Sequence, residues 1–308
     1  MKIGFLYAGQ GTQKEQMGKA LYETYPTAQK MFDSIALDFD VKQMCFEGDL
    51  ATLSQTSYTQ PCMVATAAVI TELLKEKGIT PDYVAGLSLG EYSALYAAGV
   101  FDFQTALELV RFRGLAMEDA VKGMDSMMSA ILGMERETLQ KICEEAASEG
   151  LVQIANYNCP GQLVIGGETK AVEKAAAMAL EQGAKRAVTL NVSGPFHTQL
   201  LKPASDKLKK RFETVDFKPI QIPVIFNTTA RPLAEDETVP ALLVKQVMSS
   251  VYLEDSIRYM IDQGVEAFVE IGPGKALSGF VKKISRAIPT YQVEDPETLE
   301  QTVEALKQ

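Results

Sequence analysis

The sequence predicts an α/β protein in which a mostly parallel sheet has helices on both faces and a second, smaller domain is present. Short apolar runs alternate with helical patterns in the first and last parts of the chain, which is typical of parallel strands joined by helices. One apolar run, residues 83–86, meets a Gly-x-Ser-x-Gly pentapeptide that leads into a helical pattern. The middle of the chain changes to an alternation of strands and helices with its own order.

Composition and charge exclude several classes of function. The chain has 308 residues, 46% of them hydrophobic and 23% charged, so it can bury a substantial core as one large or two smaller domains. A net charge of -10 argues against nucleic acid and anionic membranes as partners. The apolar run 3–8 is too short for a signal peptide, and no stretch approaches the length of a membrane span.

Cysteine and histidine usage argues against a metal site. The cysteines form no Cys-x-x-Cys pair, and the chain has a single histidine, so no zinc site of the usual spacing is present. We expect reduced thiols and a cytoplasmic protein. The four cysteines are Cys45, Cys62, Cys143 and Cys159.

The first part of the chain is expected to hold two strands among several helices. Its predicted elements are strand 2–8, helices up to residue 78 of which 59–77 is the longest, a short strand that begins at Tyr83 and meets the pentapeptide, helix 91–100 and helix 102–122. Asp102 is placed to cap the last of these helices, because the apolar face begins at Ala106.

The middle segment has the order β-α-β-β-α-β, which predicts a ferredoxin-like unit. Its predicted elements are strand 127–132, helix 135–148, strands 151–157 and 162–166, helix 170–182 and strand 186–192. We therefore expect a small domain over 125–193, inserted into a large domain made of 1–124 and 194–308. The large domain is expected to resume with a helix to about residue 212, strand 222–227, helices 239–249 and 253–263, strand 266–271 and one more helix.

Ser88, at the centre of the Gly-x-Ser-x-Gly pentapeptide, is the candidate nucleophile. A strained turn between strand and helix needs glycine on both sides, because a Cβ there would collide with the neighbouring backbone. The helix that follows favours a developing negative charge at its N-terminus. The alternative is an ordinary tight turn with a capping serine.

A serine nucleophile needs a base, and His197 is the one imidazole that this chain offers. It follows the stiff turn Gly194-Pro195, and sites in open α/β sheets gather where strands end. The alternative is a structural histidine. No aspartate is placed by a motif to orient the ring, so a backbone or amide oxygen is expected to do so.

The oxyanion of an acyl-transfer intermediate needs two preorganised donors. The N–H of Leu89, directly after Ser88, is one of them by the geometry of such elbows. The loop Gly9-Gln10-Gly11, which leaves the first strand, is the candidate for the other, although it also fits a plain glycine-rich turn.

Several segments in order resemble the malonyl-CoA:acyl carrier protein transacylases, acyltransferases of fatty-acid and polyketide synthesis. The resemblance covers nearly the whole chain, and the motifs together are far more specific than any one of them. They are Gly9-Gln10-Gly11, the segment from Gly86 to Glu91, Arg113-Gly114, the segment from Asn156 to Gln162, Gly194-Pro195-Phe196-His197 and the segment from Glu270 to Lys275.

The resemblance implies a hydrolase-like large domain with a ferredoxin-like insert and a dyad of Ser88 and His197. By the same resemblance, the amides of Gln10 and Leu89 form the oxyanion hole. The remaining implied roles are these: Arg113 clamps the malonyl carboxylate, Gln246 offers its main-chain carbonyl to the histidine, Asn158 lines the cleft between the domains, and Phe196 favours malonyl over a group with an α-methyl.

The resemblance also implies the substrates and partners. Malonyl-CoA donates the acyl group to the phosphopantetheine thiol of acyl carrier protein, with no bound cofactor and no metal, and we expect a monomer. Two departures are visible, since Ala8 stands where the family often has proline and Leu87 where many members have histidine. With Leu87 in place, His197 carries the role of base alone.

Two rival functions share parts of this pattern. A serine thioesterase or esterase uses the same elbow and dyad, with water in place of a thiol as the acceptor. A non-catalytic scaffold would keep the fold and only bind acyl carriers.

Two basic segments are candidates for docking an acidic carrier protein, although both also fit ordinary solvated helix faces. The first contains Lys202, Lys207, Lys209, Lys210 and Arg211, and the second contains Lys282, Lys283 and Arg286.

Overall fold

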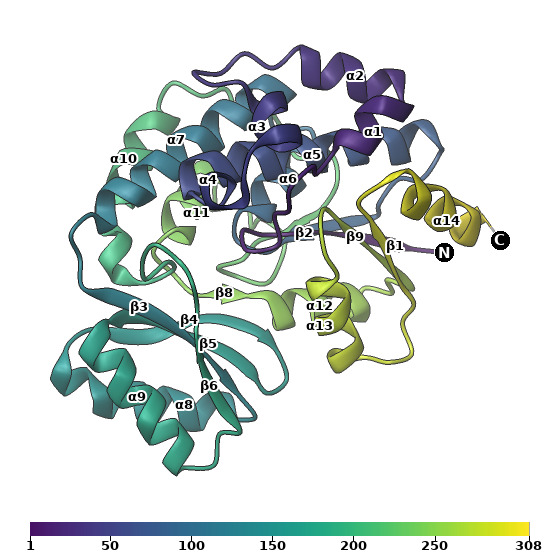
Figure 1. The fold of residues 1–308 in the computed structure, drawn as a ribbon. Coiled ribbons are helices and arrows are strands. Elements are labelled where there is room, and N and C mark those ends of the chain that lie inside the picture. The colour runs from purple at the N-terminus through teal and green to yellow at the C-terminus, as the bar shows by residue number, and fades with distance from the viewer. Residues whose placement is uncertain (308) are drawn as a thin grey trace. The chain divides into compact units, whose positions relative to one another are not determined.

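The computed structural model describes residues 1–307, and the chain divides into two compact units (Figure 1). Unit 1 comprises Met1–Leu115, Asp216–Phe226 and Ile257–Gln308. Unit 2 comprises Ala116–Val215 and Asn227–Ser256. The predicted small domain over 125–193 lies inside unit 2, which also contains flanking segments that the prediction assigned to the large domain; the predicted boundaries stay a prediction.

The elements alternate between strands and helices along most of the chain. The strands are β1 (Ile3–Tyr7), β2 (Tyr83–Gly86), β3 (Ser126–Leu132), β4 (Val152–Cys159), β5 (Gln162–Glu168), β6 (Arg186–Thr189), β7 (Val224–Ile225), β8 (Val251–Tyr252), β9 (Ala267–Ile271) and β10 (Thr290–Val293). The helices are α1 (Lys19–Thr24), α2 (Pro26–Asp33), α3 (Val41–Glu47), α4 (Leu50–Leu53), α5 (Thr56–Glu76), α6 (Gly90–Ala97), α7 (Phe103–Val121), α8 (Arg136–Ala146), α9 (Thr169–Glu181), α10 (Lys202–Phe212), α11 (Val239–Gln246), α12 (Leu253–Asp262), α13 (Ala276–Ile284) and α14 (Pro296–Lys307), with 3-10 turns η1 (Ala147–Glu149) and η2 (Gln199–Leu201).

Unit 1 is built on a five-stranded sheet in the order β10-β9-β1-β2-β7, and the pairing between each pair of neighbours is parallel. All five residues of β1, Ile-Gly-Phe-Leu-Tyr, are buried. A central parallel strand is covered on both faces, which explains a continuous apolar run in place of alternation. Figure 1 shows α5 and α6 on one side of these strands and α13 on the other. The predicted parallel sheet with helices on both faces is confirmed.

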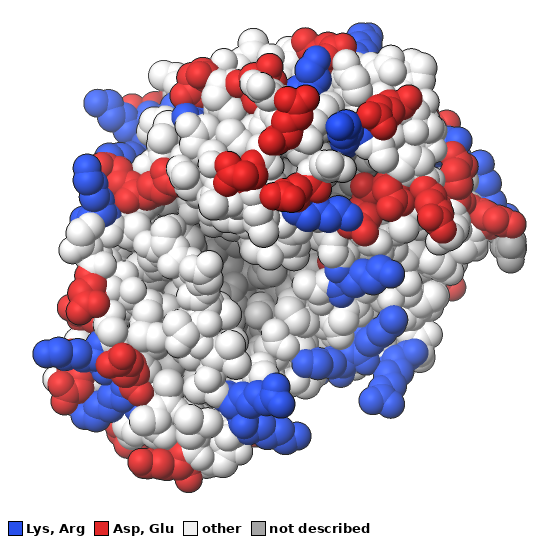
Figure 2. All heavy atoms as spheres, viewed as in Figure 1, with Lys and Arg blue, Asp and Glu red and all other residues white. Residues whose placement is uncertain are grey.

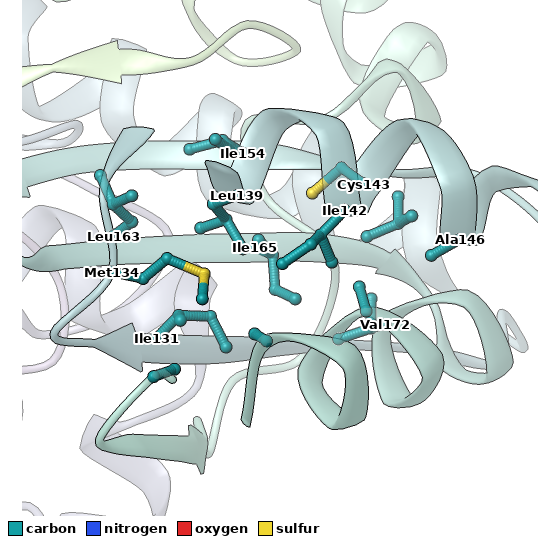
Figure 3. Close-up of a cluster of buried hydrophobic side chains, with 14 of the residues drawn as sticks. Ile131, Met134, Leu139, Ile142, Cys143, Ala146, Ile154, Leu163, Ile165 and Val172 are labelled. Carbon is teal, nitrogen blue, oxygen red and sulfur yellow. The ribbon is translucent and has the colours of Figure 1, made fainter. Parts of the chain in front are cut away.

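Unit 2 is built on a second sheet, in the order β6-β3-β5-β4-β8. Its first elements follow the order β3-α8-β4-β5-α9-β6 on which the prediction of a ferredoxin-like unit depends, and β3 pairs antiparallel with both β5 and β6. Figure 3 shows side chains of the strands, among them Ile131, Ile154 and Ile165, directed toward Ile142 of α8 and Val172 of α9. This cluster is a hydrophobic core between the second sheet and the helices α8 and α9.

Some elements differ from the sequence-based expectation. The predicted strand 222–227 is only the two-residue β7, because proline at 223 removes a ladder donor and the chain turns again after Ile225. The sequence pattern does not predict β8, β10 or α14. The β8 strand has only two residues and pairs parallel with β4, so its existence depends on a distant strand and not on local pattern.

Candidate active site

Ser88 occupies a strained turn between β2 and α6. Its φ of 54° lies in the left-handed region, which is uncommon for a residue with a Cβ. A Cβ added to Gly86 would lie 2.0 Å from the carbonyl carbon of Gly90, and one added to Gly90 would lie 2.2 Å from the carbonyl oxygen of Tyr7. Both glycines of the pentapeptide are therefore required by backbone contacts, and the turn presents Ser88 at the N-terminus of α6.

The loop Gly9-Gln10-Gly11 lies against this turn. A Cβ added to Gly9 would lie 2.6 Å from the carbonyl oxygen of Leu87, so only glycine permits this approach. The amide N–H of Leu87 donates to the Tyr7 carbonyl at 3.0 Å, which continues the pairing of β1 with β2 up to the nucleophile. The side chain of Gln10 donates to Thr56 Oγ1 at 3.0 Å. The structure thus places the Gln10 loop and the turn before Leu89 next to each other.

Ala8, which stands where the related family often has proline, makes a hydrogen bond that proline lacks the donor for. Its N–H donates to the carbonyl of Ile271 at 3.0 Å and ties β1 to β9 just before the Gln10 loop begins. The departure from the family pattern thus adds a backbone contact at the base of this loop.

Arg113, on α7, lies beside Ser88. Its side chain is 1% exposed, and Nη2 donates a hydrogen bond to Ser88 Oγ at 3.2 Å. The guanidinium also lies over the ring of Tyr92 at 5.4 Å from the centroid. Burial lowers the pKa of Arg113, and the neighbouring Tyr92 and Glu91 only partly oppose this shift. A guanidinium stays protonated in proteins, so a buried cation lies next to the candidate nucleophile.

His197 is also held in a strained backbone conformation, with φ of 60°. Its ring Nδ1 lies 2.9 Å from the main-chain oxygen of Gln246, and its amide N–H donates to the Val247 carbonyl at 3.2 Å. Because a carbonyl only accepts, Nδ1 carries the proton in this contact and Nε2 is left as the basic nitrogen. The imidazole is 3% exposed.

The carbonyl that faces His197 is available because Gln246 is the last residue of α11. The final carbonyls of a helix lack intrahelical donors and carry the negative end of its dipole, so this oxygen is a good acceptor for the Nδ1–H of His197. The N–H of Ser249 shares this carbonyl at 3.3 Å. The fully buried Gln246 side chain donates to Asn227 Oδ1 at 3.3 Å, which fixes the end of α11.

Gln153 of β4 is a residue that the sequence analysis does not single out. Its Nε2 donates to the His197 carbonyl at 3.5 Å, and its Oε1 accepts from the Gln199 N–H at 3.1 Å. One side chain thus spans the turn that contains His197. No local signal distinguishes Gln153 from any other polar residue on a strand.

Asn158 and Phe196, the two remaining predicted residues, are both 7% exposed. Asn158 belongs to β4, and its Oδ1 has no hydrogen-bond partner among residues 1–307. Phe196 directly precedes His197. Neither position by itself assigns a role.

The predicted site residues are divided between the two units. Gln10, Ser88, Leu89 and Arg113 belong to unit 1, and Asn158, Phe196, His197 and Gln246 belong to unit 2. In residues 1–307, no three His, Cys, Asp or Glu side chains are grouped so that they would hold a metal ion. None of the helices formed by these residues is long and apolar enough to cross a membrane.

A family model described as an acyl transferase domain matches residues 4–295. The chain belongs to this family. It is 47% identical over 310 residues to the malonyl CoA-acyl carrier protein transacylase of Bacillus subtilis, covering 100% of this chain and 98% of that relative. The resemblance stated from the sequence motifs is confirmed.

Solved structures of related acyl transferases have the same fold. The malonyl CoA-acyl carrier protein transacylase of Clostridium perfringens superposes with a TM-score of 0.96 at 40% identity, covering 100% of this chain and 98% of that one. Another, at 36% identity and a TM-score of 0.95, covers 99% of this chain and 100% of that one. It is described as a malonyl-transacylase in complex with its type II PKS acyl-carrier protein, PlMCAT:AntF (holo).

Proposed function

We propose that this acyl transferase moves a malonyl group from malonyl-CoA to the phosphopantetheine thiol of acyl carrier protein, through a malonyl ester on Ser88. The observation that carries the proposal is the buried Arg113 guanidinium, whose Nη2 donates to Ser88 Oγ at 3.2 Å. A buried cation beside a nucleophilic serine favours an acyl group that carries its own carboxylate. The names of the relatives support the same substrate.

In the first half-reaction, Ser88 Oγ attacks the thioester carbonyl while Nε2 of His197 takes the hydroxyl proton. The carbonyl oxygen becomes an oxyanion that accepts hydrogen bonds from the amides of Leu89 and Gln10. The C–S bond then breaks, and the CoA sulfur leaves with the proton returned by His197. The products are free CoA and malonyl-Ser88.

In the second half-reaction, the carrier protein's thiol gives its proton to His197 and its sulfur attacks the ester carbonyl of malonyl-Ser88. The C–O bond breaks, and Ser88 Oγ regains a proton from His197. The Gln246 carbonyl holds Nδ1–H throughout and stabilises the imidazolium that forms twice in each cycle. Nucleophile, base and oxyanion donors all come from the chain, so the reaction needs no cofactor.

Arg113 supplies the selectivity for malonyl in this mechanism. A planar guanidinium binds a carboxylate through two parallel hydrogen bonds. Binding the malonyl carboxylate there places the thioester end of the same short group next to Ser88, whose Oγ is already a hydrogen-bond partner of Arg113. An uncharged acetyl group gains neither interaction.

The proposal includes a cytoplasmic location and a carrier-docking site on α13. The four cysteines are buried and none of them forms a disulfide in the described chain, and such cysteine usage is typical of proteins in reducing compartments. In α10, two of the five cations face acids, since Lys202 pairs with Asp206 and Lys207 with Asp119. The sequence of α13 contains no acidic residue, and Figure 2 shows Lys and Arg side chains gathered over this helix. Its last turn carries Lys282 and Lys283.

The test is the intact mass of the protein after mixing with malonyl-CoA alone. We expect a malonyl adduct in the wild type and in Ser93→Ala, a serine-to-alanine control within α6, and none in Ser88→Ala. A phosphopantetheine thiol is expected to discharge the adduct faster than water does. Faster discharge by water would identify a thioesterase, and a wild type without any adduct would identify a scaffold that only binds acyl carriers.

A further inference from the structure

The first turn of α5 contains a carbonyl group that its own helix leaves without the usual donor. Pro61 lies inside this helix, and proline has no N–H, so the bond from residue 61 to the carbonyl of Ser57 is absent. The side chain of Arg111 supplies a donor from outside the helix, since its Nη1 donates to the Ser57 carbonyl at 2.9 Å. Pro61 thus leaves the Ser57 carbonyl of α5 to accept a hydrogen bond from Arg111 of α7.

Arg111 is itself held firmly. Its Nε and Nη2 donate to both carboxylate oxygens of Asp38 at 2.8 and 2.7 Å. The guanidinium lies over the rings of Phe39 and Tyr58, at 4.8 and 5.1 Å from their centroids. A bidentate, aromatic-lined guanidinium is pre-organised, so it fixes the helix that carries it better than a flexible lysine would.

The same face of α7 touches the first turn of α5 a second time, at Gly114. A Cβ added there would lie 2.7 Å from the Cα of Ser57 and 2.9 Å from the carbonyl oxygen of Thr56. Residues 111 and 114 are three apart and lie on one face of a helix, whereas residue 113 points elsewhere. Arg113 therefore lies between two contacts that fix α7 to α5 and points toward Ser88.

We propose that Arg111 is a positioning residue for malonyl selectivity: by binding the Ser57 carbonyl, it sets the position of α7 and so of the Arg113 guanidinium. This inference rests on the proposed function for the identity of the carboxylate. Since misplacing a reacting group by about 1 Å can cost about 100-fold in rate, a small shift of α7 is sufficient to lower selectivity.

The test compares Arg111→Met with three matched variants. Asp38→Asn removes the outer ion pair and keeps the Ser57 contact. Pro61→Ala restores the N–H at residue 61 within α5, and the carbonyl can accept from both donors. In the double variant Pro61→Ala with Arg111→Met, the N–H at residue 61 can bind the Ser57 carbonyl, but Arg111 no longer links α7 to it. This variant therefore separates a loss of protein stability from a shift in the position of α7.

The readout is the ratio of Ser88 acylation rates, kcat/KM, by malonyl-CoA and by acetyl-CoA, together with the melting temperature. We expect Arg111→Met to lower this ratio about tenfold. The double variant is expected to regain melting temperature but not the ratio, while Asp38→Asn and Pro61→Ala keep the wild-type ratio. A ratio that recovers in the double variant, or that never falls, would overturn the proposal.

A crystal structure of the double variant tests the same proposal without malonyl chemistry. We expect the hydrogen bond from Arg113 Nη2 to Ser88 Oγ, 3.2 Å in the wild type, to be lost or lengthened. An unchanged contact would overturn the role of Arg111 even if malonyl-CoA proved not to be the substrate. A wild type that takes no acyl group from malonyl-CoA would overturn the proposed function and leave this structural comparison to decide on Arg111.

Discussion

At the scale of single residues, the two positions that the chemistry requires are among the four non-glycine residues of the described chain with positive φ, the other two being Gln16 and Ala230. Ser88 and His197 both have positive φ, and neither is glycine. Conformations of this kind cost of order 1–3 kcal/mol and persist only where the surroundings enforce them. Around Ser88 the glycines at 86 and 90 give the backbone room, and around His197 the contacts of Gln246 and Gln153 hold the turn. These surrounding contacts hold Ser88 and His197 in their strained backbone conformations.

Replacing Arg113 tests the assignment of selectivity to one side chain. Arg113→Ala is expected to lower malonyl transfer by about 100-fold or more, because two hydrogen bonds to a charged group contribute roughly 1.5–3 kcal/mol each. Acetyl transfer is expected to stay or to rise, since it makes no use of the guanidinium. Steady-state kcat/KM with the two acyl-CoA substrates measures both effects. Equal losses with malonyl and acetyl would show that Arg113 serves the nucleophile and not the carboxylate.

At the scale of elements, the turn around Ser88 is predictable from sequence because its cause is local. The five residues of the pentapeptide determine this turn. A Cβ at Gly86 or Gly90 would collide with neighbouring backbone, so the two glycines must keep these positions. The cap of α7 is equally local, with Asp102 Oδ1 accepting from the Thr105 N–H at 2.8 Å. The contact between Arg111 and Ser57 joins residues 54 apart, and it depends on how two helices pack. No periodicity or propensity contains that information, which is also why the role of Gln153 escapes prediction.

A buried glutamate at the first turn of α13 is expected to make the stability of the protein depend on pH. Glu270, at the end of β9, is buried and accepts hydrogen bonds from the N–H groups of Leu277 and Ser278 at 3.0 and 2.8 Å. Burial raises the pKa of Glu270, and the two backbone hydrogen bonds only partly oppose that shift. The folded protein therefore takes up a proton at Glu270 at a higher pH than the unfolded chain does.

The sign of the resulting stability change follows from linkage. Between the ordinary glutamate pKa of 4.5 and the raised value, the folded state binds more protons, so the free energy of unfolding falls as pH rises through this window. Compared with Glu270→Gln, the wild type is expected to gain stability as pH is lowered from about 7 to about 5. Urea unfolding of both proteins at several pH values measures the difference. A wild type that loses stability relative to Glu270→Gln on acidification would mean that the hydrogen bonds to Glu270 outweigh its burial.

At the scale of the whole molecule, charge poses a problem that only a local surface solves. The chain has a net charge of -10, so its overall interaction with an acidic carrier protein is repulsive. Docking needs a local region of the surface where cations outnumber acids. We expect this region on α13, which has no acidic residue of its own, whereas α10 contains Asp206.

Two double charge reversals separate the local effect from the overall one. Lys282→Glu with Lys283→Glu and Lys209→Glu with Lys210→Glu each replace two positive charges by two negative ones, a change of -4, so both take the net charge from -10 to -14. Overall repulsion is therefore the same in the two variants. We expect the first variant to raise the carrier protein's KM about tenfold and the second to change it less than about twofold, while the KM for malonyl-CoA stays constant in the control.

Salt distinguishes the two variants further, because screening weakens attraction and repulsion alike. Between about 20 and about 200 mM salt, kcat/KM for the carrier protein is expected to fall in the wild type and in the α10 variant, where a local attraction is being screened. In the α13 variant it is expected to rise, since only repulsion remains to be screened. Identical salt responses in both variants would place the docking surface on neither helix and would show that net charge alone governs the encounter.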